Sequence, residues 1–254
     1  MLAAASLLSL GVEHCRTPTL VPIRTREDLG ALLRDLNFTG NAAELGTRGG
    51  SFTRWVLQGW TRCDEYVQVD VWRQLDNYTD TANNKNGEQQ KWRQRAHRAL
   101  KDMTARGFTR RGHQCAKLTS DCVKDYRDGY FDFIYVDARH DRLGVLQDLS
   151  EWWPKLRVGG LMAGHDYMTQ KEPKNLKQPK GVIAEDPTST MQDWTLNFDG
   201  TRDETNRTVK GAVDDFFAGV VGGRFPSPVD VKRCPRQVVV TYREAAWNTW
   251  MVRK

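Results

Sequence analysis

The sequence predicts an α/β fold: a single doubly wound, mostly parallel sheet of about seven strands with a C-terminal antiparallel hairpin. The first observation is that short apolar runs alternate with amphipathic segments, an order typical of a sheet covered by helices. The second is that residues 131–136 and 161–163 are apolar runs on either side of a stretch with helical spacing, as in a right-handed βαβ unit. The third is that the last two strand candidates are joined by a short connection.

The N-terminal half contains the segments expected to form the first strands and helices. Thr25 and Asp28 form a capping-box pair before a leucine stripe, which predicts a helix. The polar stretch 74–87 has no periodicity and is expected to be a loop. Ser120 or Asp121 is the expected N-cap of a helix after the third strand. The expected elements of this half are helix 24–36, strand 41–45, helix 51–60, strand 65–71, helix 88–105 and strand 108–118.

The C-terminal part contains a long polar segment before the last helix and the hairpin. Residues 168–210 carry few apolar side chains and directly follow a predicted strand end. A loop of this length inside a compact domain is usually functional or disordered, so we expect a lid or acceptor-binding segment. Asp193 and Trp194 within it are candidate acceptor contacts. The last expected elements are helix 211–221 and strands 237–242 and 247–252.

The composition is that of a soluble globular protein. The 254 residues are 39% hydrophobic and 28% charged, and no apolar run approaches the about 20 residues that a membrane helix requires. The net charge is +6, and residues 91–111 contain eight Lys or Arg and one acidic residue, Asp102. We interpret this stretch as the solvated face of a helix rather than a polyanion-binding patch, so no nucleic acid partner is expected.

The cysteines and the N-terminus leave the cellular compartment open. Five cysteines, at positions 15, 63, 115, 122 and 234, form no CxxC pair, so neither a zinc site nor a redox centre is indicated. Because their number is odd, one thiol must stay free in a monomer. Residues 1–12 are apolar but lack a basic region, which fits either a remnant of a targeting segment or a first helix. Both the cytoplasm and the lumen of the secretory pathway are therefore compatible with the sequence.

A glycine-rich loop lies where a cofactor loop is expected, between a predicted strand and helix at residues 44–51. Glycines let the backbone approach a ligand closely, and the helix N-terminus adds unpaired N–H donors, although a structural turn is the plain alternative. No Lys-Ser/Thr pair follows, so this is not a P-loop. Asp70, at the next strand end, matches a carboxylate that binds a ribose diol. Glu44 before the loop favours a cationic ligand group, which S-adenosylmethionine has and NAD lacks.

Two polar clusters follow the strands of the central βαβ unit. Asp137, His140 and Asp141 come after the first strand, and His165 and Asp166 come after the second. Because ligands bind at the carboxyl ends of parallel strands, we expect both clusters to converge on one catalytic centre. The structural alternatives are that Asp137 and Asp166 cap strand–helix junctions, that His140 is an exposed residue, and that Asp141 is an N-cap or surface acid.

Together these motifs resemble a known family. ELGTRGGSF, YVQVDVW, the turn at Ser120 and Asp121, and YVDARHD followed by LRVGGLMAGHDY look like the successive motifs of a class I S-adenosylmethionine-dependent methyltransferase. The likeness is greatest to small O-methyltransferases of the macrocin type, whose acceptors are often sugar hydroxyls. The resemblance implies a Rossmann-like methyltransferase domain over residues 37–254, preceded by an N-terminal segment and helix over residues 1–36.

The resemblance also implies which residues bind the cofactor. By position, the loop residues line the methionine end of S-adenosylmethionine, Asp70 binds the ribose, and Ser120 and Asp121 border the adenine. Ser120 is as readily a plain helix cap, and the two roles are compatible. The cofactor-binding residues expected on this basis are Glu44, Gly46, Thr47, Gly49, Ser51, Asp70, Ser120, Asp121 and Asp137.

The acid–imidazole cluster predicts how the acceptor is activated. An attacking alcohol loses its proton, and the usual aids are a general base and a divalent cation. Two carboxylates plus waters are a natural Mg²⁺ site, so Asp137 and Asp166 are the expected metal ligands. The family likeness implies that His140, three residues after Asp137, is the base. His165 departs from the family pattern, since imidazole is a softer ligand, and it is either a third metal ligand or a pocket residue.

The predicted function is therefore methyl transfer from S-adenosylmethionine to a hydroxyl of a small molecule or glycan, with Mg²⁺ or another divalent cation and His140 as base. One alternative is metal-free N-methylation of a small amine, and another is a non-catalytic cofactor-binding module. Nucleic-acid methylation is disfavoured because the tetrapeptide N/D-P-P-Y/F is absent. The sequence leaves a homo-oligomer open.

Overall fold

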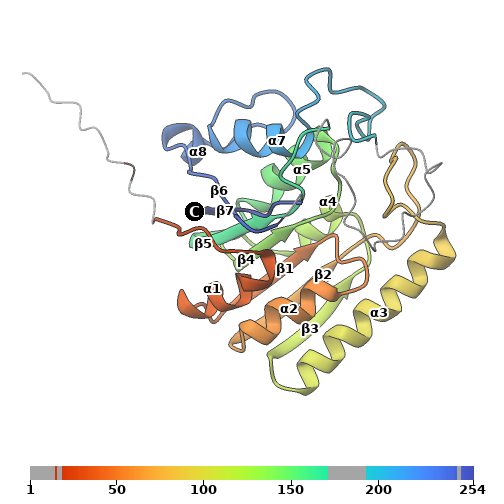
Figure 1. Ribbon diagram of the computed structural model, residues 1–254, viewed down its shortest axis with the longest axis vertical. Helices are drawn as coiled ribbons and strands as arrows, with labels where there is room; N and C mark the ends of the chain where they lie inside the picture. Colours follow the sequence, from red (N-terminus) through yellow and green to blue (C-terminus); the bar gives the residue numbers. More distant parts are fainter. Residues whose placement is uncertain (1–14, 16–18, 171–192, 245–246) are drawn as a thin grey trace, which may run out of the picture.

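The computed structural model describes residue 15 and residues 19–170, 193–244 and 247–254. Within these residues one sheet has the strand order β3-β2-β1-β4-β5-β7-β6 (Figure 1). The first five strands pair in parallel, whereas β7 is antiparallel to both β5 and β6. The strands are β1 (Asn41–Leu45), β2 (Cys63–Val69), β3 (Thr109–Cys115), β4 (Phe131–Val136), β5 (Leu156–Gly164), β6 (Val239–Val240) and β7 (Trp250–Arg253). The predicted doubly wound, mostly parallel sheet with a C-terminal hairpin is confirmed.

Helices cover both faces of this sheet (Figure 1). On one face lie η1 and α1–α3, and on the other α4, η2, α5, α7 and α8. Because successive strand residues point to opposite faces, Phe133 packs in the first layer and Ile134 in the second. The helices are η1 (Arg26–Asp28), α1 (Leu29–Asp35), α2 (Ser51–Gly59), α3 (Asn86–Ala105), α4 (Thr119–Cys122), η2 (Val123–Asp125), α5 (Arg142–Trp152), α7 (Thr208–Phe217) and α8 (Val229–Arg233).

The burial of the central strand β4 explains why its apolar run could be recognised in the sequence. All six of its residues are buried, since helices cover the sheet on both sides. The strand β3 is harder to read because it lies at the sheet edge and its middle residues are exposed, so it carries Arg110, Arg111 and His113. It is nevertheless a full strand paired with β2, as predicted for residues 108–118.

Two expectations about helix starts had different outcomes. Asp141 is the N-cap of α5: it is buried, and its side chain accepts a hydrogen bond from the Gly144 amide at 3.1 Å, so it is not a surface acid. The expected cap of α4 by Ser120 or Asp121 is wrong, because the helix begins at Thr119 and Leu118 occupies the N-cap position. The helix starts earlier because Leu118 already accepts the first helical hydrogen bonds, from the Asp121 and Cys122 amides.

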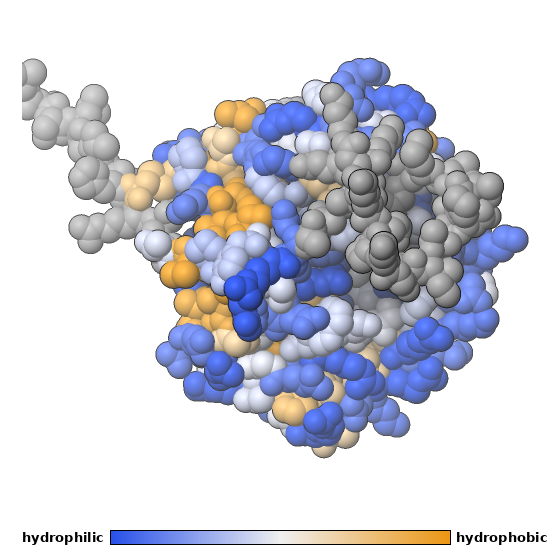
Figure 2. All heavy atoms as spheres, in the orientation of Figure 1, coloured by the Kyte–Doolittle hydropathy of each residue, from blue (hydrophilic) through white to orange (hydrophobic). Residues whose placement is uncertain are grey.

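The surface agrees with the composition. In the orientation of Figure 1 most of the visible surface is hydrophilic, with hydrophobic residues gathered on its left side (Figure 2). Among the described residues, no helix is long and apolar enough to cross a membrane. The proposed lid over residues 168–210 lies partly outside the described residues. Its described end, from Asp193, forms a bridge between Leu196 and Arg202 before α7 begins.

Candidate active site

A cavity of about 360 Å³ opens at the carboxyl ends of the parallel strands. It lies between β1 and β4, where the strand order reverses: from β1 the chain continues outward to β2 on one side, and from β4 it continues outward to β5 on the other. Open α/β sheets bind their ligands at such a reversal point. Its walls come from every loop that follows β1–β5. They include Gly46, Arg48, Asp70, Tyr78, Asp80, Leu118, Thr119, Asp137, Arg139, His140, His165, Asp166, Trp194 and Trp247. A wider hollow of about 710 Å³ lies beside β3, but it contains none of the predicted site residues.

Gly46 makes the crossing of the β1 and β4 loops sterically feasible. Its φ of 85° lies in the left-handed region, and a Cβ on it would stand 1.8 Å from the Asp137 carbonyl oxygen. The Asp137 amide donates to the Leu45 carbonyl at 2.8 Å, so the two strand ends are held against each other. Only glycine fits this approach, which places the predicted cofactor loop directly beside Asp137.

Glu44 lies beneath the cofactor loop and outside the lining of the cavity. Its Oε2 accepts hydrogen bonds from the Thr53 hydroxyl at 2.5 Å and the Tyr66 hydroxyl at 2.9 Å. Burial raises the pKa of this carboxyl to about 8, and the two hydrogen bonds only partly oppose the increase. In the ligand-free protein Glu44 is therefore mostly protonated at neutral pH.

We expect Glu44 to make the stability of the ligand-free protein depend on pH. Between the unfolded pKa of 4.5 and the folded pKa of about 8, the folded state holds a proton that the unfolded state has released, so stability falls as pH rises. Between pH 5 and pH 7 this amounts to about 3 kcal/mol. Urea unfolding at both pH values should show the decrease in wild type and a smaller one in Glu44→Gln. Parallel pH dependences of the two proteins would contradict this assignment.

Asp70 reaches the cavity at the end of β2. Its Oδ2 accepts from the Arg48 amide at 2.7 Å and its Oδ1 from the Trp72 amide at 2.8 Å. Burial raises its pKa, and the hydrogen bonds from Trp72 and Arg48 oppose that shift. The carboxylate is thereby fixed in orientation, and each oxygen retains a lone pair for a ligand.

The other predicted loop residues do not line the cavity. Thr47 is buried and donates its hydroxyl to the Glu44 carbonyl at 3.3 Å, while Ser51 is the exposed first residue of α2. Gly49 faces Trp92, whose ring a Cβ would meet at 2.6 Å. These residues shape the loop, and Gly46 and Arg48 are the members that line the cavity.

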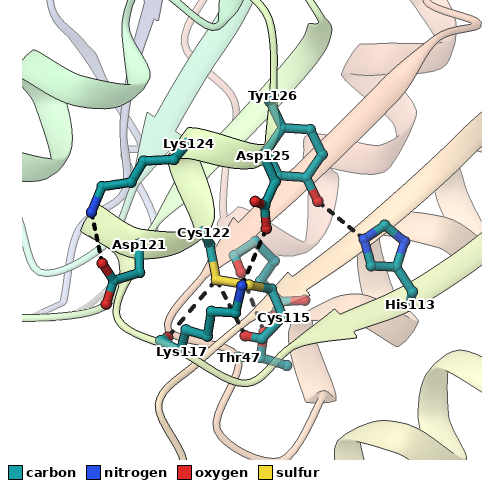
Figure 3. Close-up of a disulfide and its surroundings, with 10 residues drawn as sticks. Thr47, His113, Cys115, Lys117, Asp121, Cys122, Lys124, Asp125 and Tyr126 are labelled. Atoms are coloured by element: carbon teal, nitrogen blue, oxygen red, sulfur yellow. Dashed lines mark hydrogen bonds and ion pairs between the residues drawn. A yellow bond between two sulfur atoms is a disulfide. The ribbon is translucent and has the colours of Figure 1, made fainter.

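On the adenine side, the structure brings neighbouring residues to the cavity in place of the predicted pair. Leu118 and Thr119 line it, whereas Ser120 does not, and Asp121 pairs with Lys124 at 2.8 Å on the surface. A disulfide between Cys115 at the end of β3 and Cys122 in α4 closes this turn (Figure 3). Since Leu118 and Thr119 lie between the two cysteines, the disulfide braces one wall of the cavity.

We expect the double substitution Cys115→Ser and Cys122→Ser to destabilise the protein and weaken S-adenosylmethionine binding. Opening a crosslink over this short loop costs about 2–3 kcal/mol of stability. Chemical unfolding and calorimetry measure the two effects. A second disulfide joins Cys15 to Cys234, so reductant added to the double variant reports that bond alone. Unchanged cofactor affinity in the double variant would show that the wall keeps its shape without the disulfide.

The odd number of cysteines predicted one free thiol, and this is the buried Cys63.

The two polar clusters converge as predicted. Asp137, His140 and Asp166 each offer a ligand atom, and these atoms lie within 4.8 Å of one another. His140 Nε2 is 2.9 Å from Asp166 Oδ2 and 3.5 Å from Asp137 Oδ1. The Nε2 atom is buried and makes no aligned hydrogen bond to the described residues, so its contact with Asp166 is electrostatic. The group has the composition of a divalent cation site with two oxygen ligands and one nitrogen ligand.

Comparison with known proteins assigns the chain to a family. Residues 43–167, from β1 to just beyond β5, match the model of a family described as a methyltransferase domain. This chain is a class I methyltransferase. The predicted S-adenosylmethionine-dependent enzyme class is confirmed, while the likeness to the macrocin type remains a resemblance.

Solved structures agree with this fold. A protein from Corynebacterium glutamicum is 15% identical with a TM-score of 0.50, and the alignment covers 89% of this chain and 79% of that chain. An O-methyltransferase from Bacillus cereus, in complex with SAH, is 15% identical with the same TM-score, with 90% and 80% covered. At this identity the two structures establish the fold alone. No curated protein matches the methyltransferase.

His140 of the methyltransferase is surrounded by acidic and hydroxyl groups. Its Nδ1 lies 2.9 Å from Asp80 Oδ2 and 3.3 Å from the Tyr78 hydroxyl. Burial favours the neutral ring, but Tyr78, Asp166 and Asp80 outweigh burial and hold the pKa of His140 well above its usual value. Burial likewise opposes the charge on Asp166, and His140 and His165 outweigh it, so the pKa of Asp166 is lowered.

His165 lies beside Asp166 at the end of β5. Its Nδ1 is 3.1 Å from Asp166 Oδ1, and its side chain is 11% exposed. Burial lowers its pKa, but the Asp166 charge more than compensates, so the pKa is raised. Among the described residues, His165 is not part of the three-residue group that could hold a cation, so its expected role as a metal ligand remains a prediction.

The sequence interpretation missed several residues of the site. Asp80 and Tyr78 come from the loop 74–87, and Arg26 comes from η1, with its guanidinium 4.0 Å from Asp137 Oδ2. Trp247, before β7, completes the cavity wall beside Trp194. The only sequence signal for Asp80 and Tyr78 is a high density of Asp and Tyr in a segment without periodicity, and nothing in the sequence marks Arg26 or Trp247.

Proposed function

We propose that this methyltransferase transfers the methyl group of S-adenosylmethionine to a hydroxyl of a small molecule or glycan, with His140 as the general base. A divalent cation, Mg²⁺ or another, is held by Asp137 and Asp166. The observation that carries this proposal is the convergence of Asp137, His140 and Asp166 on the cavity that Gly46 and Asp70 also line. One cavity thus offers a donor side and an activating side.

The cofactor side is supported by the order of the loops around the cavity. Asp70, fixed by the Arg48 and Trp72 amides, is placed to accept hydrogen bonds from a ribose. Leu118 and Thr119 offer a partly apolar wall for the adenine, next to the positions predicted from sequence. Glu44, Thr47, Gly49 and Ser51 act by shaping the loop, and Glu44 ionises when a cationic group binds nearby.

The activating side suits an alcohol acceptor. A sulfonium already has a good leaving group, so the chemical need is to remove the hydroxyl proton as the oxygen attacks. His140 Nε2 lies in the cavity wall between two carboxylates and has no aligned hydrogen-bond partner among the described residues, so it is available to an incoming hydroxyl. The proton taken up by Nε2 gives an imidazolium that Asp166 and Asp80 stabilise.

The donor set fits a divalent cation. Two carboxylates within reach of one another repel unless a positive charge lies between them, so Asp137 and Asp166 would hold the cation and leave Nε2 free to act as the base. When bound, the cation would polarise the acceptor hydroxyl and take over the negative charge that otherwise keeps His140 protonated. Oxygen ligands favour Mg²⁺ or Mn²⁺. His165 holds Asp166 in place by their contact.

The acceptor side of the cavity is aromatic. Trp194 is buried, and its ring centroid lies 4.6 Å from that of His140. The ring centroid of Trp247 lies 6.1 Å from that of Trp194. Tyr78 adds a third ring to the lining. Such surfaces bind sugar rings or planar phenols, and the segment 168–210 that carries Trp194 and Asp193 acts as the acceptor loop.

The test is label transfer to matched acceptors. Purified protein is incubated with methyl-labelled S-adenosylmethionine and pairs of sugars, catechols and phenols, each alongside an amine of the same skeleton. We expect labelled ethers from the hydroxyl compounds. Label on the amines alone would establish N-methylation instead, and no label on any acceptor, with no heat of cofactor binding, would indicate a non-catalytic module.

A further inference from the structure

We propose that Asp80 is a positioning residue that orients the His140 ring, an inference that rests on the proposed role of His140 as base. Asp80 lies in the irregular loop after β2, sixty residues before His140 in sequence. Its side chain is only 2% exposed, and its Oδ2 lies 2.9 Å from His140 Nδ1. A buried carboxylate at hydrogen-bond distance from one imidazole nitrogen constrains the proton and the rotation of the whole ring.

The two nitrogens of His140 have different surroundings. Nδ1 makes its hydrogen bond to Asp80, whereas Nε2 faces Asp137 and Asp166 without an aligned hydrogen bond. A carboxylate at Nδ1 keeps a proton on that nitrogen, so the proton that the ring loses when a cation binds comes from Nε2, and the Nε2 lone pair then faces the cavity. Asp80 therefore selects the form of the ring that accepts a proton from a substrate hydroxyl.

Tyr78 is the only other group within hydrogen-bond distance of Nδ1 among the residues that the structure describes. Its hydroxyl is 3.3 Å away and donates to the Ala138 carbonyl at 3.1 Å. The Asp80 carboxylate is both nearer and charged, so it is the stronger acceptor for the Nδ1 proton. Tyr78 packs beside the pair without replacing it.

Asp80 is itself held by two further donors. The Ala82 amide donates to Oδ1 at 2.7 Å, and the Trp194 indole donates to Oδ2 at 2.7 Å. The same oxygen thus contacts His140 and Trp194, whose rings also touch. Three segments far apart in sequence meet at this carboxylate, so the orientation of the base is tied to the loop that forms the acceptor wall.

Asp80→Asn tests the role, because the amide keeps the size of the carboxylate and removes its charge. We expect turnover to fall by about 100-fold, with little change in KM and with S-adenosylmethionine affinity within twofold of wild type. Asp76→Asn, at an exposed position of the same loop, should behave as wild type. Trp194→Phe keeps an aromatic ring at this position but removes the indole N–H that donates to Asp80, so it should reduce turnover less than Asp80→Asn.

A second measurement needs no turnover. NMR of ¹⁵N-histidine-labelled protein should show a strongly hydrogen-bonded Nδ1 proton that is present in wild type and Asp76→Asn and absent in Asp80→Asn and His140→Gln. Wild-type protein lacking this proton, or Asp80→Asn with unchanged turnover, would overturn the proposal, and the wild-type spectrum decides even if the variant fails to fold. Failure of the proposed function would look different, since the Nδ1 signal would persist in a protein that transfers no methyl group.

Discussion

Replacing His140 by alanine is expected to lower the turnover number for methyl transfer by about 10³-fold. Among the described residues, this imidazole is the group whose nitrogen faces both carboxylates at the cavity wall, so its loss leaves the acceptor hydroxyl without a base. S-adenosylmethionine affinity should persist, because His140 makes none of the contacts that fix Asp70 or the loop at Gly46. Steady-state turnover with a hydroxyl acceptor and calorimetry with the cofactor measure the two quantities.

The matched control is His97→Ala, since His97 is an exposed histidine on α3 and lies outside the cavity. It should retain wild-type turnover. If His140→Ala and His97→Ala were equally active, the acceptor would lose its proton without help from this imidazole, and the base assignment would be wrong.

Asp166→Asn is expected to weaken divalent cation binding by at least about tenfold and to lower turnover in parallel. Asp166 has a φ of 53°, and asparagine is the residue best suited to that left-handed backbone, so the substitution changes charge with little strain. Calorimetric titration with Mg²⁺ and turnover at several Mg²⁺ concentrations give the two values. Turnover should recover partly at high Mg²⁺, because Asp137 still offers a carboxylate.

The control is Asp128→Asn, which removes a largely exposed carboxylate from the turn before β4. Its cation affinity should equal that of wild type. An Asp166→Asn variant with wild-type Mg²⁺ affinity would place any cation elsewhere and leave Asp166 as a partner of His140 and His165 only.

The central part of the site followed from the sequence because parallel strands bring their carboxyl ends to one edge. Buried apolar runs marked β4 and β5, so the acids and imidazoles after them had to meet at that edge. The same reasoning placed Asp70 at the end of β2. Gly46 was predicted as a cofactor residue, but its close approach to Asp137 depends on the pairing of β1 with β4, which periodicity does not reveal.

The rest depended on contacts that no local pattern encodes. Asp80 lies in a loop without periodicity, and its partners His140 and Trp194 are 60 and 114 residues away in sequence. Ser120 and Asp121 were placed at the cavity where Leu118 and Thr119 lie, because the start of a one-turn helix cannot be fixed from capping preference alone. Cysteine pairing was not deducible either, since five cysteines allow many connectivities.

The most direct test of the central claim is methyl-label transfer to the hydroxyl acceptor panel, run with Mg²⁺ and with excess chelator. We expect labelled ether with Mg²⁺, little or none with chelator, and recovery when Mg²⁺ is restored. Full turnover under chelation would contradict a cation at Asp137 and Asp166, and label found on amines alone would contradict O-methylation itself.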